Sequence, residues 1–104
     1  MSSCIFCKII SGELPVPRVY EDDTVIVIND IAPQAPVHLL IIPKKHVENI
    51  VQLTEQDFFL GEVIFKTAQR VSKNIGINSF KLLLNNGFAA GQTVFHMHAH
   101  LLAE

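Results

Sequence analysis

Three of the five histidines in this chain, His96, His98 and His100, occupy alternate positions of one short segment. Successive side chains of an extended strand point to opposite faces, so this spacing predicts three imidazoles on one surface. Near neutral pH an imidazole can act as a base, an acid, a nucleophile or a metal ligand. The segment is therefore predicted either to catalyse a reaction or to hold a metal. The opposite face of the strand would be apolar, formed by Phe95, Met97, Ala99 and Leu101.

The residues just before the histidines favour chemistry on a phosphate. No Asp or Glu occurs between Glu62 and Glu104, which argues against a hard-cation site because such cations take oxygen ligands. Glycines would let the backbone approach an oxyanion closely, and neutral amides and a hydroxyl can donate to phosphate oxygens. An ordinary glycine-containing loop between strands is the alternative. The candidate contacts to the phosphate or leaving group are Asn85, Gly91, Gln92 and Thr93.

Three motifs then point to one family. Gly91–Leu102 resembles the His-φ-His-φ-His-φ-φ signature of the histidine triad (HIT) family, in which φ is an apolar residue. Asn29–His38 and Ile41–His46 resemble the Hint-like branch, the histidine triad nucleotide-binding proteins. The similarity runs from about Cys4 to Leu102, nearly the whole chain. It implies an α+β fold of the HIT type, with a five-stranded antiparallel sheet, a long helix and a short N-terminal helix, assembled as a homodimer.

The resemblance also implies roles for the histidines. His98 would attack phosphorus and form a covalent nucleotidyl-imidazole intermediate that water then cleaves. Neutral imidazole is a suitable nucleophile at pH 7, which makes this role chemically reasonable. His100 would contact the phosphoryl group and help to protonate the leaving group, His38 would orient the pair, and His96 would complete the catalytic group. Without the motif, His38 is simply a strand histidine near a proline turn.

By the same resemblance, a purine nucleotide is the expected ligand. Asp30 would accept both ribose hydroxyls, because a carboxylate has two acceptor oxygens, although Asp30 equally suits a turn. Asn29 would stand beside the base. The walls of the base pocket would come from residues that could instead belong to the core, namely Ile5, Phe6, Ile9, Ile28 and Ile31.

The cysteines carry a separate hypothesis. Cys4 and Cys7 have metal-binding spacing, but a closed tetrahedral zinc site needs two more ligands. Some bacterial HIT proteins, which this chain resembles, pair such cysteines with the positions of His46 and His96. A zinc there would be structural, and catalysis would need no cofactor. The alternative is two reduced thiols beside the core.

The leading functional hypothesis is a hydrolase of purine nucleoside phosphoramidates, in which a nucleoside monophosphate is joined to an amine through nitrogen. A dinucleoside polyphosphate hydrolase is the enzymatic alternative. That branch usually carries a longer C-terminal tail, and the sequence stops at Glu104, which disfavours it. Phe88–Ala90 replaces a more polar loop of the Hint-like proteins, so leaving-group preference is open. A non-catalytic nucleotide-binding or zinc-binding module is the third hypothesis.

The elements that must position these residues follow an α+β order. Cys4–Ile10 is predicted to be a short helix that ends before Gly12. Thr54, with Asp57 three residues later, resembles the N-cap of a helix that ends near Ile75. The buried stripe of this helix is predicted as Phe58, Gly61, Phe65, Ala68, Val71 and Ile75. The predicted strands are Val19–Glu21, Thr24–Ile28, Val37–Ile42, Phe80–Leu84 and Val94–Leu101.

Composition sets the remaining bounds. At 104 residues the chain is predicted to be one domain, residues 1–104. With 49% hydrophobic residues and a net charge of −2, it is predicted to be a soluble globular protein that binds no nucleic acid in a groove. The N-terminal residues lack the pattern of a signal peptide, and no segment reaches membrane-spanning length. Two cysteines indicate no disulfide framework, so a reducing, cytoplasmic location is expected.

Overall fold

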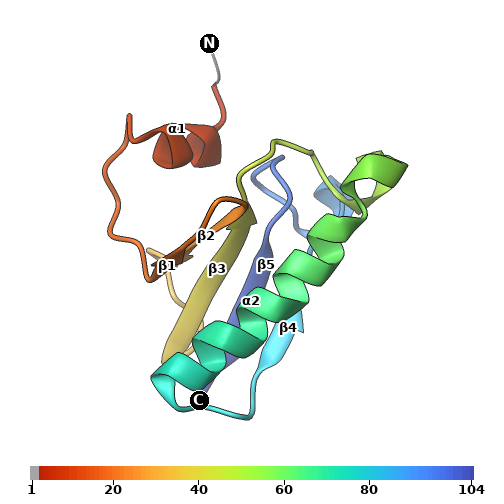
Figure 1. Ribbon diagram of the computed structural model, residues 1–104. Coiled ribbons are helices and arrows are strands. Elements are labelled where there is room, and N and C mark those ends of the chain that lie inside the picture. The colour runs from red at the N-terminus through yellow and green to blue at the C-terminus, as the bar shows by residue number, and fades with distance from the viewer. Residues whose placement is uncertain (1–2) are drawn as a thin grey trace.

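The computed structural model describes residues 3–104 and contains one antiparallel sheet between two helices (Figure 1). The strand order is β1-β2-β3-β5-β4. The family resemblance therefore predicted the architecture correctly. The helices are α1 (Ile5–Ser11) and α2 (Phe59–Ile75), and the strands are β1 (Tyr20–Glu21), β2 (Val25–Asn29), β3 (Val37–Pro43), β4 (Lys81–Leu83) and β5 (Ala99–Ala103).

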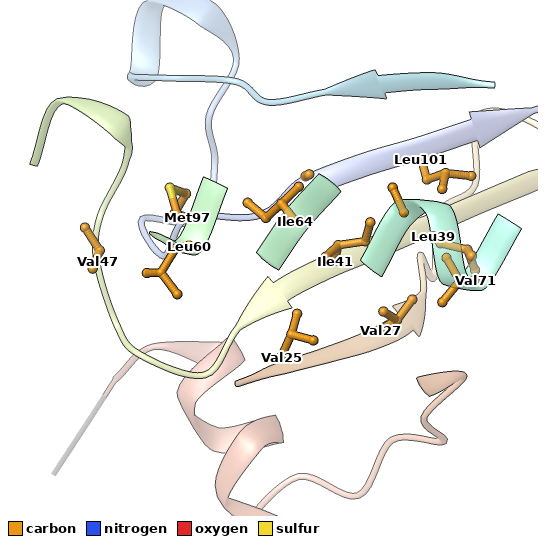
Figure 2. Close-up of a cluster of buried hydrophobic side chains, with 12 residues drawn as sticks. Val25, Val27, Leu39, Ile41, Val47, Leu60, Ile64, Val71, Met97 and Leu101 are labelled. Atoms are coloured by element: carbon orange, nitrogen blue, oxygen red, sulfur yellow. The ribbon is translucent and has the colours of Figure 1, made fainter. Parts of the chain in front are cut away.

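Each face of the sheet carries its own apolar cluster. On one face, Val25, Leu39 and Ile41 pack against α2, as Figure 2 shows. On the other face, Ile26 and Leu40 pack against α1. Because β2 and β3 are covered on both sides, their sequences are continuous apolar runs rather than alternating patterns.

The start of α2 differs from the predicted helix. A 3₁₀ turn, Glu55–Asp57, precedes it, and the Thr54 hydroxyl donates to the Asp57 carboxylate at 3.1 Å. The Asp57 carboxylate also accepts a hydrogen bond from the Lys45 ammonium at 2.6 Å, and this contact joins the β3–α2 connection to the start of the helix. The predicted end is correct, because Gly76 closes α2 in the left-handed region with φ 80°.

The predicted buried stripe of α2 is wrong for half of its members. Phe58, Phe65 and Ile75 are 59%, 68% and 42% exposed, whereas Ala68 and Val71 are buried as expected. The helix carries two adjacent apolar series at helical spacing, and periodicity alone cannot decide which one faces the sheet. The buried residues of the helix are Leu60, Ile64, Thr67, Ala68, Val71 and Ser72.

The predicted strand through the three histidines is also wrong in its first half. The ladder of β5 with β3 begins at Ala99, paired with Ile41, so only His100 of the three lies in a strand. Before it, the Met97 N–H donates to the Val47 carbonyl at 2.6 Å, which holds this segment on the β3–α2 connection instead. Phe95 is 39% exposed and so leaves the predicted apolar face, while Met97, Ala99 and Leu101 are buried.

Neither α1 nor α2 is long and apolar enough to cross a membrane, and no other helix among residues 3–104 is either.

Candidate active site

The register of β3 and β5 places two histidines on the sheet face opposite α2. His38 pairs with Leu102 and Leu40 pairs with His100, and residues directly opposite in an antiparallel pair share a face. Beside them lies a cavity of about 360 Å³. Its lining is Asp30, Ala32, Gln34, His38, Leu83, Asn85, Gly91, Thr93, His98, His100 and Leu102.

His98 presents a ring nitrogen with a free electron pair. Its Nδ1 lies 2.7 Å from the carbonyl oxygen of His96, and because a carbonyl only accepts, Nδ1 carries the proton. Nε2 is then left with the lone pair. The ring of Phe6 packs edge-on against the imidazole, with centroids 4.9 Å apart. Burial lowers the pKa of His98, against the opposing effects of the His96 carbonyl and the Asp30 carboxylate, so the neutral ring is favoured at neutral pH.

His38 and His100 form a hydrogen-bonded pair with the opposite arrangement. The backbone N–H of Gln34 donates to His38 Nδ1 at 3.1 Å, so the proton of His38 is on Nε2. His38 Nε2 lies 2.9 Å from His100 Nδ1, which accepts the His38 N–H. His100 therefore carries its own proton on Nε2. Its ring centroid lies 5.1 Å from that of His98, so one donor ring and one lone-pair ring stand side by side at the cavity.

Burial is also the main influence on His100. It lowers the pKa of His100, and the neighbouring His98 and His38 lower it further, while the Asp30 carboxylate raises it. Asp30 reaches the pair through Oδ2, which lies 3.3 Å from His38 Nε2. The other oxygen, Oδ1, accepts the backbone N–H of Ala32 at 2.8 Å. Asp30 is thus both a turn residue and a charged group of the cavity.

Gln92 lies outside the cavity, contrary to its predicted contact with the phosphate. It is 2% exposed, and its Oε1 accepts the Gly87 N–H at 2.7 Å. Its Nε2 donates to the carbonyls of Glu48 at 2.7 Å and Val94 at 3.0 Å. Both the N–H groups and the oxygen of the Gln92 amide are hydrogen-bonded within the protein. The amide therefore shapes the loop and has no hydrogen-bonding group available for a ligand.

The other predicted phosphate contacts line the cavity. Asn85, Gly91 and Thr93 all border it, and the Asn85 amide also donates to the Ala90 carbonyl at 2.8 Å. Gly91 has φ 94°, and a Cβ there would stand 3.5 Å from the Asn85 amide nitrogen. A glycine is needed here because a side chain would be strained in this conformation.

The predicted base contacts are not gathered at this cavity. Phe6, Ile9 and Ile28 are 6%, 5% and 4% exposed and belong to the core between α1 and the sheet. Ile5 and Ile31 are exposed, by 46% and 95%, and Asn29 is exposed as well. Phe6, Ile9 and Ile28 are therefore core residues, which is the alternative that the sequence left open.

The four predicted metal ligands converge. Their ligand atoms all lie within 4.8 Å of one another. Cys7 Sγ is 3.2 Å from His46 Nδ1, Cys4 Sγ is 3.5 Å from His96 Nδ1, and the two Nδ1 atoms are 3.1 Å apart. Bond lengths of about 2.0–2.3 Å place the ligand atoms of a tetrahedral zinc about 3.3–3.8 Å apart, so the donor set fits.

The ring of His96 belongs to the cluster with Cys4, Cys7 and His46, and its backbone carbonyl reaches the cavity. Its Nε2 donates to the Pro43 carbonyl at 2.7 Å, which leaves Nδ1 with the lone pair that faces the two cysteines. The ring is fully buried and does not border the cavity, whereas the carbonyl holds His98. His96 therefore contacts the residues of the cavity through its carbonyl oxygen and not through its ring.

Asp30, His38 and His100 also lie close enough to hold a metal ion, within 4.8 Å of one another. The tautomer argues against it. A metal would need the lone pair of His38 Nε2, and the Gln34 N–H already requires the lone pair on Nδ1. This second group is therefore a hydrogen-bonding network.

Backbone groups supply the contacts that sequence reasoning missed. The Gln34 N–H, the Pro43 carbonyl and the His96 carbonyl set the tautomers of three histidines, and no residue type signals such a group. Leu83 and Leu102 also border the cavity. Strand alternation would have found Leu102, which lies two residues after His100 on the same face, whereas Leu83 is placed by the register of β4 with β5, in which it pairs with His100.

Comparison with known proteins adds a family assignment. Residues 3–104 match the family described as scavenger mRNA decapping enzyme C-terminal binding. An uncharacterised HIT-like protein of Chlamydia trachomatis is 48% identical over 99 residues, covering 94% of this chain and 89% of its own. Protein HitA of Neisseria gonorrhoeae is 41% identical over 104 residues, covering 98% and 96%.

Solved structures agree with the sequence relatives. A HIT family hydrolase from Clostridium thermocellum superposes with a TM-score of 0.95 at 48% identity, covering 100% of this chain and 92% of its own. A histidine triad protein from Clostridium difficile gives a TM-score of 0.96 at 38% identity, with the same coverage of 100% and 92%. The histidines, the fold and the relatives lead to one conclusion: the chain belongs to the histidine triad family.

Proposed function

We propose that this protein is a nucleotide-binding hydrolase that cleaves purine nucleoside phosphoramidates through a covalent intermediate on His98. The observation that carries the proposal is the 2.7 Å contact between His98 Nδ1 and the His96 carbonyl, which leaves the Nε2 lone pair available at the cavity. Relatives described as HIT family hydrolases, from Clostridium thermocellum and Legionella pneumophila, support hydrolysis as the reaction class.

The reaction would proceed in two balanced steps. First, the His98 Nε2 lone pair bonds to phosphorus and the phosphorus–nitrogen bond breaks with its electron pair going to nitrogen. The protonated, cationic form of His100 gives its Nε2 proton to that nitrogen and becomes neutral. Water then attacks phosphorus and gives a proton to Nε2 of His100. The P–Nε2 bond breaks, and its electron pair returns to His98. The products are an amine and a nucleoside monophosphate. The His96 carbonyl would stabilise the positive charge on the nucleotidylated ring.

The nucleotide would lie against the residues that border the cavity. Asn85, Gly91 and Thr93 would contact the phosphate or the leaving group, and Asp30 the ribose. Ile5, Ile31 and Asn29 are exposed and available to a base, whereas Phe6, Ile9 and Ile28 would support the site from the core. Adenine and guanine nucleotides are both candidates.

The test is substitution of the nucleophile. His98→Ala should lower the hydrolysis of adenosine 5′-phosphoramidate by on the order of 10⁴-fold or more, because a nucleophile and its acid act as a unit. Wild-type protein, quenched in denaturant at alkaline pH and digested, should carry a nucleotidyl mass on the peptide with His98. Asp23→Asn, at an exposed turn, is the matched control. Unchanged turnover by His98→Ala would disprove the mechanism.

The same assay addresses a second enzymatic candidate. The matched family is named after a decapping enzyme, and this name supports a phosphoanhydride as the alternative class of substrate. A kcat/KM for a diadenosine polyphosphate that exceeds the value for the phosphoramidate would make this the better assignment. Nucleotide binding without turnover of either substrate would leave a binding module.

We further propose that Cys4, Cys7, His46 and His96 hold a structural zinc ion. The convergence of two thiols with two imidazoles supports this, because His96 presents the Nδ1 lone pair to the cluster. Four protein ligands complete a tetrahedral shell with no open position, so such a zinc would brace the fold and catalysis would need no cofactor.

A homodimer is proposed as the assembly. The edge strand β4 and the exposed apolar side chains of α2 lie next to a hollow of about 340 Å³ that Phe65, Phe80 and Leu82 border. An open strand edge beside apolar surface is the kind of feature that a second copy can cover.

A further inference from the structure

The carboxylate of Asp30 stands at the His38–His100 pair although its implied task is elsewhere, on the ribose. Asp30 Oδ2 is 3.3 Å from His38 Nε2, and a carboxylate oxygen of Asp30 lies within 4.8 Å of one ring nitrogen of each of the two histidines. Asp30 is only partly buried, whereas His38 is 4% exposed. A negative charge at this distance from two largely enclosed imidazoles interacts strongly with any proton they bind.

Adding a proton to His100 creates a conflict that Asp30 can resolve. Neutral His100 accepts the His38 Nε2–H at Nδ1, over 2.9 Å. Protonated His100 would present an N–H at Nδ1, so two donors would face each other. His38 cannot turn its Nε2 into an acceptor, because the Gln34 N–H requires the lone pair on Nδ1. One of the two N–H groups therefore needs another acceptor, and Asp30 Oδ2 lies 3.3 Å from His38 Nε2.

Among residues 3–104, Asp30 is the carboxylate that borders the cavity beside the pair, and the side chains of Gln34, Asn85 and Thr93 at this cavity are uncharged. His98 faces His100 from the segment before β5, and it lowers the pKa of His100. From β4, Leu83 shares the face of His100, and Lys81, opposite Leu102, is itself a cation. From β3, Leu40 is apolar. Burial and both histidines lower the pKa of His100, and Asp30 acts against them.

We propose that Asp30 is the counter-ion of the His38–His100 pair and keeps on His100 the proton that it gives to the leaving group. The inference rests on the proposed function for the identity of the step. In that step the Nε2 proton passes to the departing nitrogen, and the Nδ1 proton stays on His100, directed at Asp30. His100 is then neutral with a lone pair on Nε2, which is the form that can take a proton from water in the second step.

Asp30→Asn with two substrates separates this role from ribose binding. The amide oxygen can still accept the Ala32 N–H, but the negative charge is lost. The substrates are adenosine 5′-phosphoramidate and its 2′,3′-dideoxy analogue, which lacks both hydroxyls. If Asp30 serves only the ribose, the variant hydrolyses the dideoxy compound as fast as the wild type does. If Asp30 is a counter-ion, loss of its charge lowers kcat for both compounds by about tenfold or more, because a pKa lower by one unit reduces the protonated fraction of His100 about tenfold.

The pH dependence of kcat provides a second test of the counter-ion role. The acid must be protonated, so the rate falls as pH rises through the pKa of His100. Loss of the counter-ion lowers that pKa, and the alkaline limb of kcat should move to lower pH in Asp30→Asn. Asp23→Asn, which removes an exposed carboxylate from the β1–β2 turn, should leave both limbs and both rates in place.

Nitrogen-15 NMR of the ligand-free protein tests the inference without any substrate. The imidazole of His100, assigned with a His100→Asn variant, should titrate at lower pH in Asp30→Asn than in the wild type. Equal titration midpoints together with an unchanged dideoxy rate would overturn the counter-ion role. Inactivity of the wild type on every phosphoramidate would instead overturn the proposed function, and the NMR titration would then decide this inference alone. Backbone spectra of the variant verify its folding.

Discussion

His96 and His98 are two residues apart, yet their rings belong to different sites. Each ring is oriented by a backbone carbonyl, that of Pro43 for His96 and that of His96 for His98. One ring consequently offers Nδ1 to the cysteines, and the other offers Nε2 to the cavity. The identity of the histidines predicts that chemistry takes place here, while the carbonyls determine which nitrogen performs it.

Gln92 and Thr93 are adjacent residues with opposite expected roles. Gln92→Ala should lower the free energy of unfolding by about 2–4 kcal/mol, because it leaves buried backbone partners without their hydrogen bonds. Thr93→Val should change the unfolding free energy by less than about 0.5 kcal/mol, as an exposed site does, yet slow turnover because Thr93 borders the cavity. Urea denaturation and a turnover assay on both variants measure this. A fully stable Gln92→Ala would contradict the loop-shaping role.

At the scale of elements, α1 connects the cluster of Cys4, Cys7, His46 and His96 to the histidines of the cavity. Its N-terminal turn carries Cys7, with Cys4 as the N-cap, and its buried Phe6 packs against His98. The Arg18 guanidinium donates to the carbonyl of Ile9 at the other end of this helix. A short helix has little stability by itself, so these attachments keep α1 in place.

The zinc proposal makes an element-scale prediction. Protein purified without chelators should contain one zinc per chain by elemental analysis, and a strong chelator should lower the melting temperature. Cys7→Ser should lose most of the zinc and melt lower, because a structural metal contributes binding free energy to folding. Ser11→Ala, at the far end of α1, is the control that should keep the metal. Wild-type protein that is purified without zinc, or whose melting temperature is lowered neither by the chelator nor by Cys7→Ser, would contradict a structural zinc.

At the scale of the whole molecule, the unexpected surface is the outer side of α2. Phe58 and Phe65 are exposed there by 59% and 68%, and Phe80 by 37% next to β4. The sequence predicted the first two as core because their spacing is helical, and spacing is all that a pattern records. Large apolar side chains gathered on one outer face are typical of a surface that another protein covers.

The homodimer should therefore depend on this face. Light scattering after gel filtration should give twice the chain mass for the wild type. Phe65→Lys should weaken the dimer by about tenfold or more, because a charge replaces an aromatic contact in an apolar interface. Val51→Lys changes a 75% exposed apolar residue outside α2 and should leave the mass unchanged. A monomeric wild type at micromolar concentration would contradict the assembly.

The sequence alone predicted the order of helices and strands, because this order depends on residue type and local spacing. Its resemblance to the histidine triad family implied the family and the members of both histidine groups. It could not show that β5 begins after His98, since the Met97–Val47 contact joins segments far apart in the chain. Nor could it separate His96 from His98, remove Gln92 from the cavity, or bring Asp30 to His38. Those outcomes required the tertiary structure, because each depends on a partner whose position only the folded backbone determines.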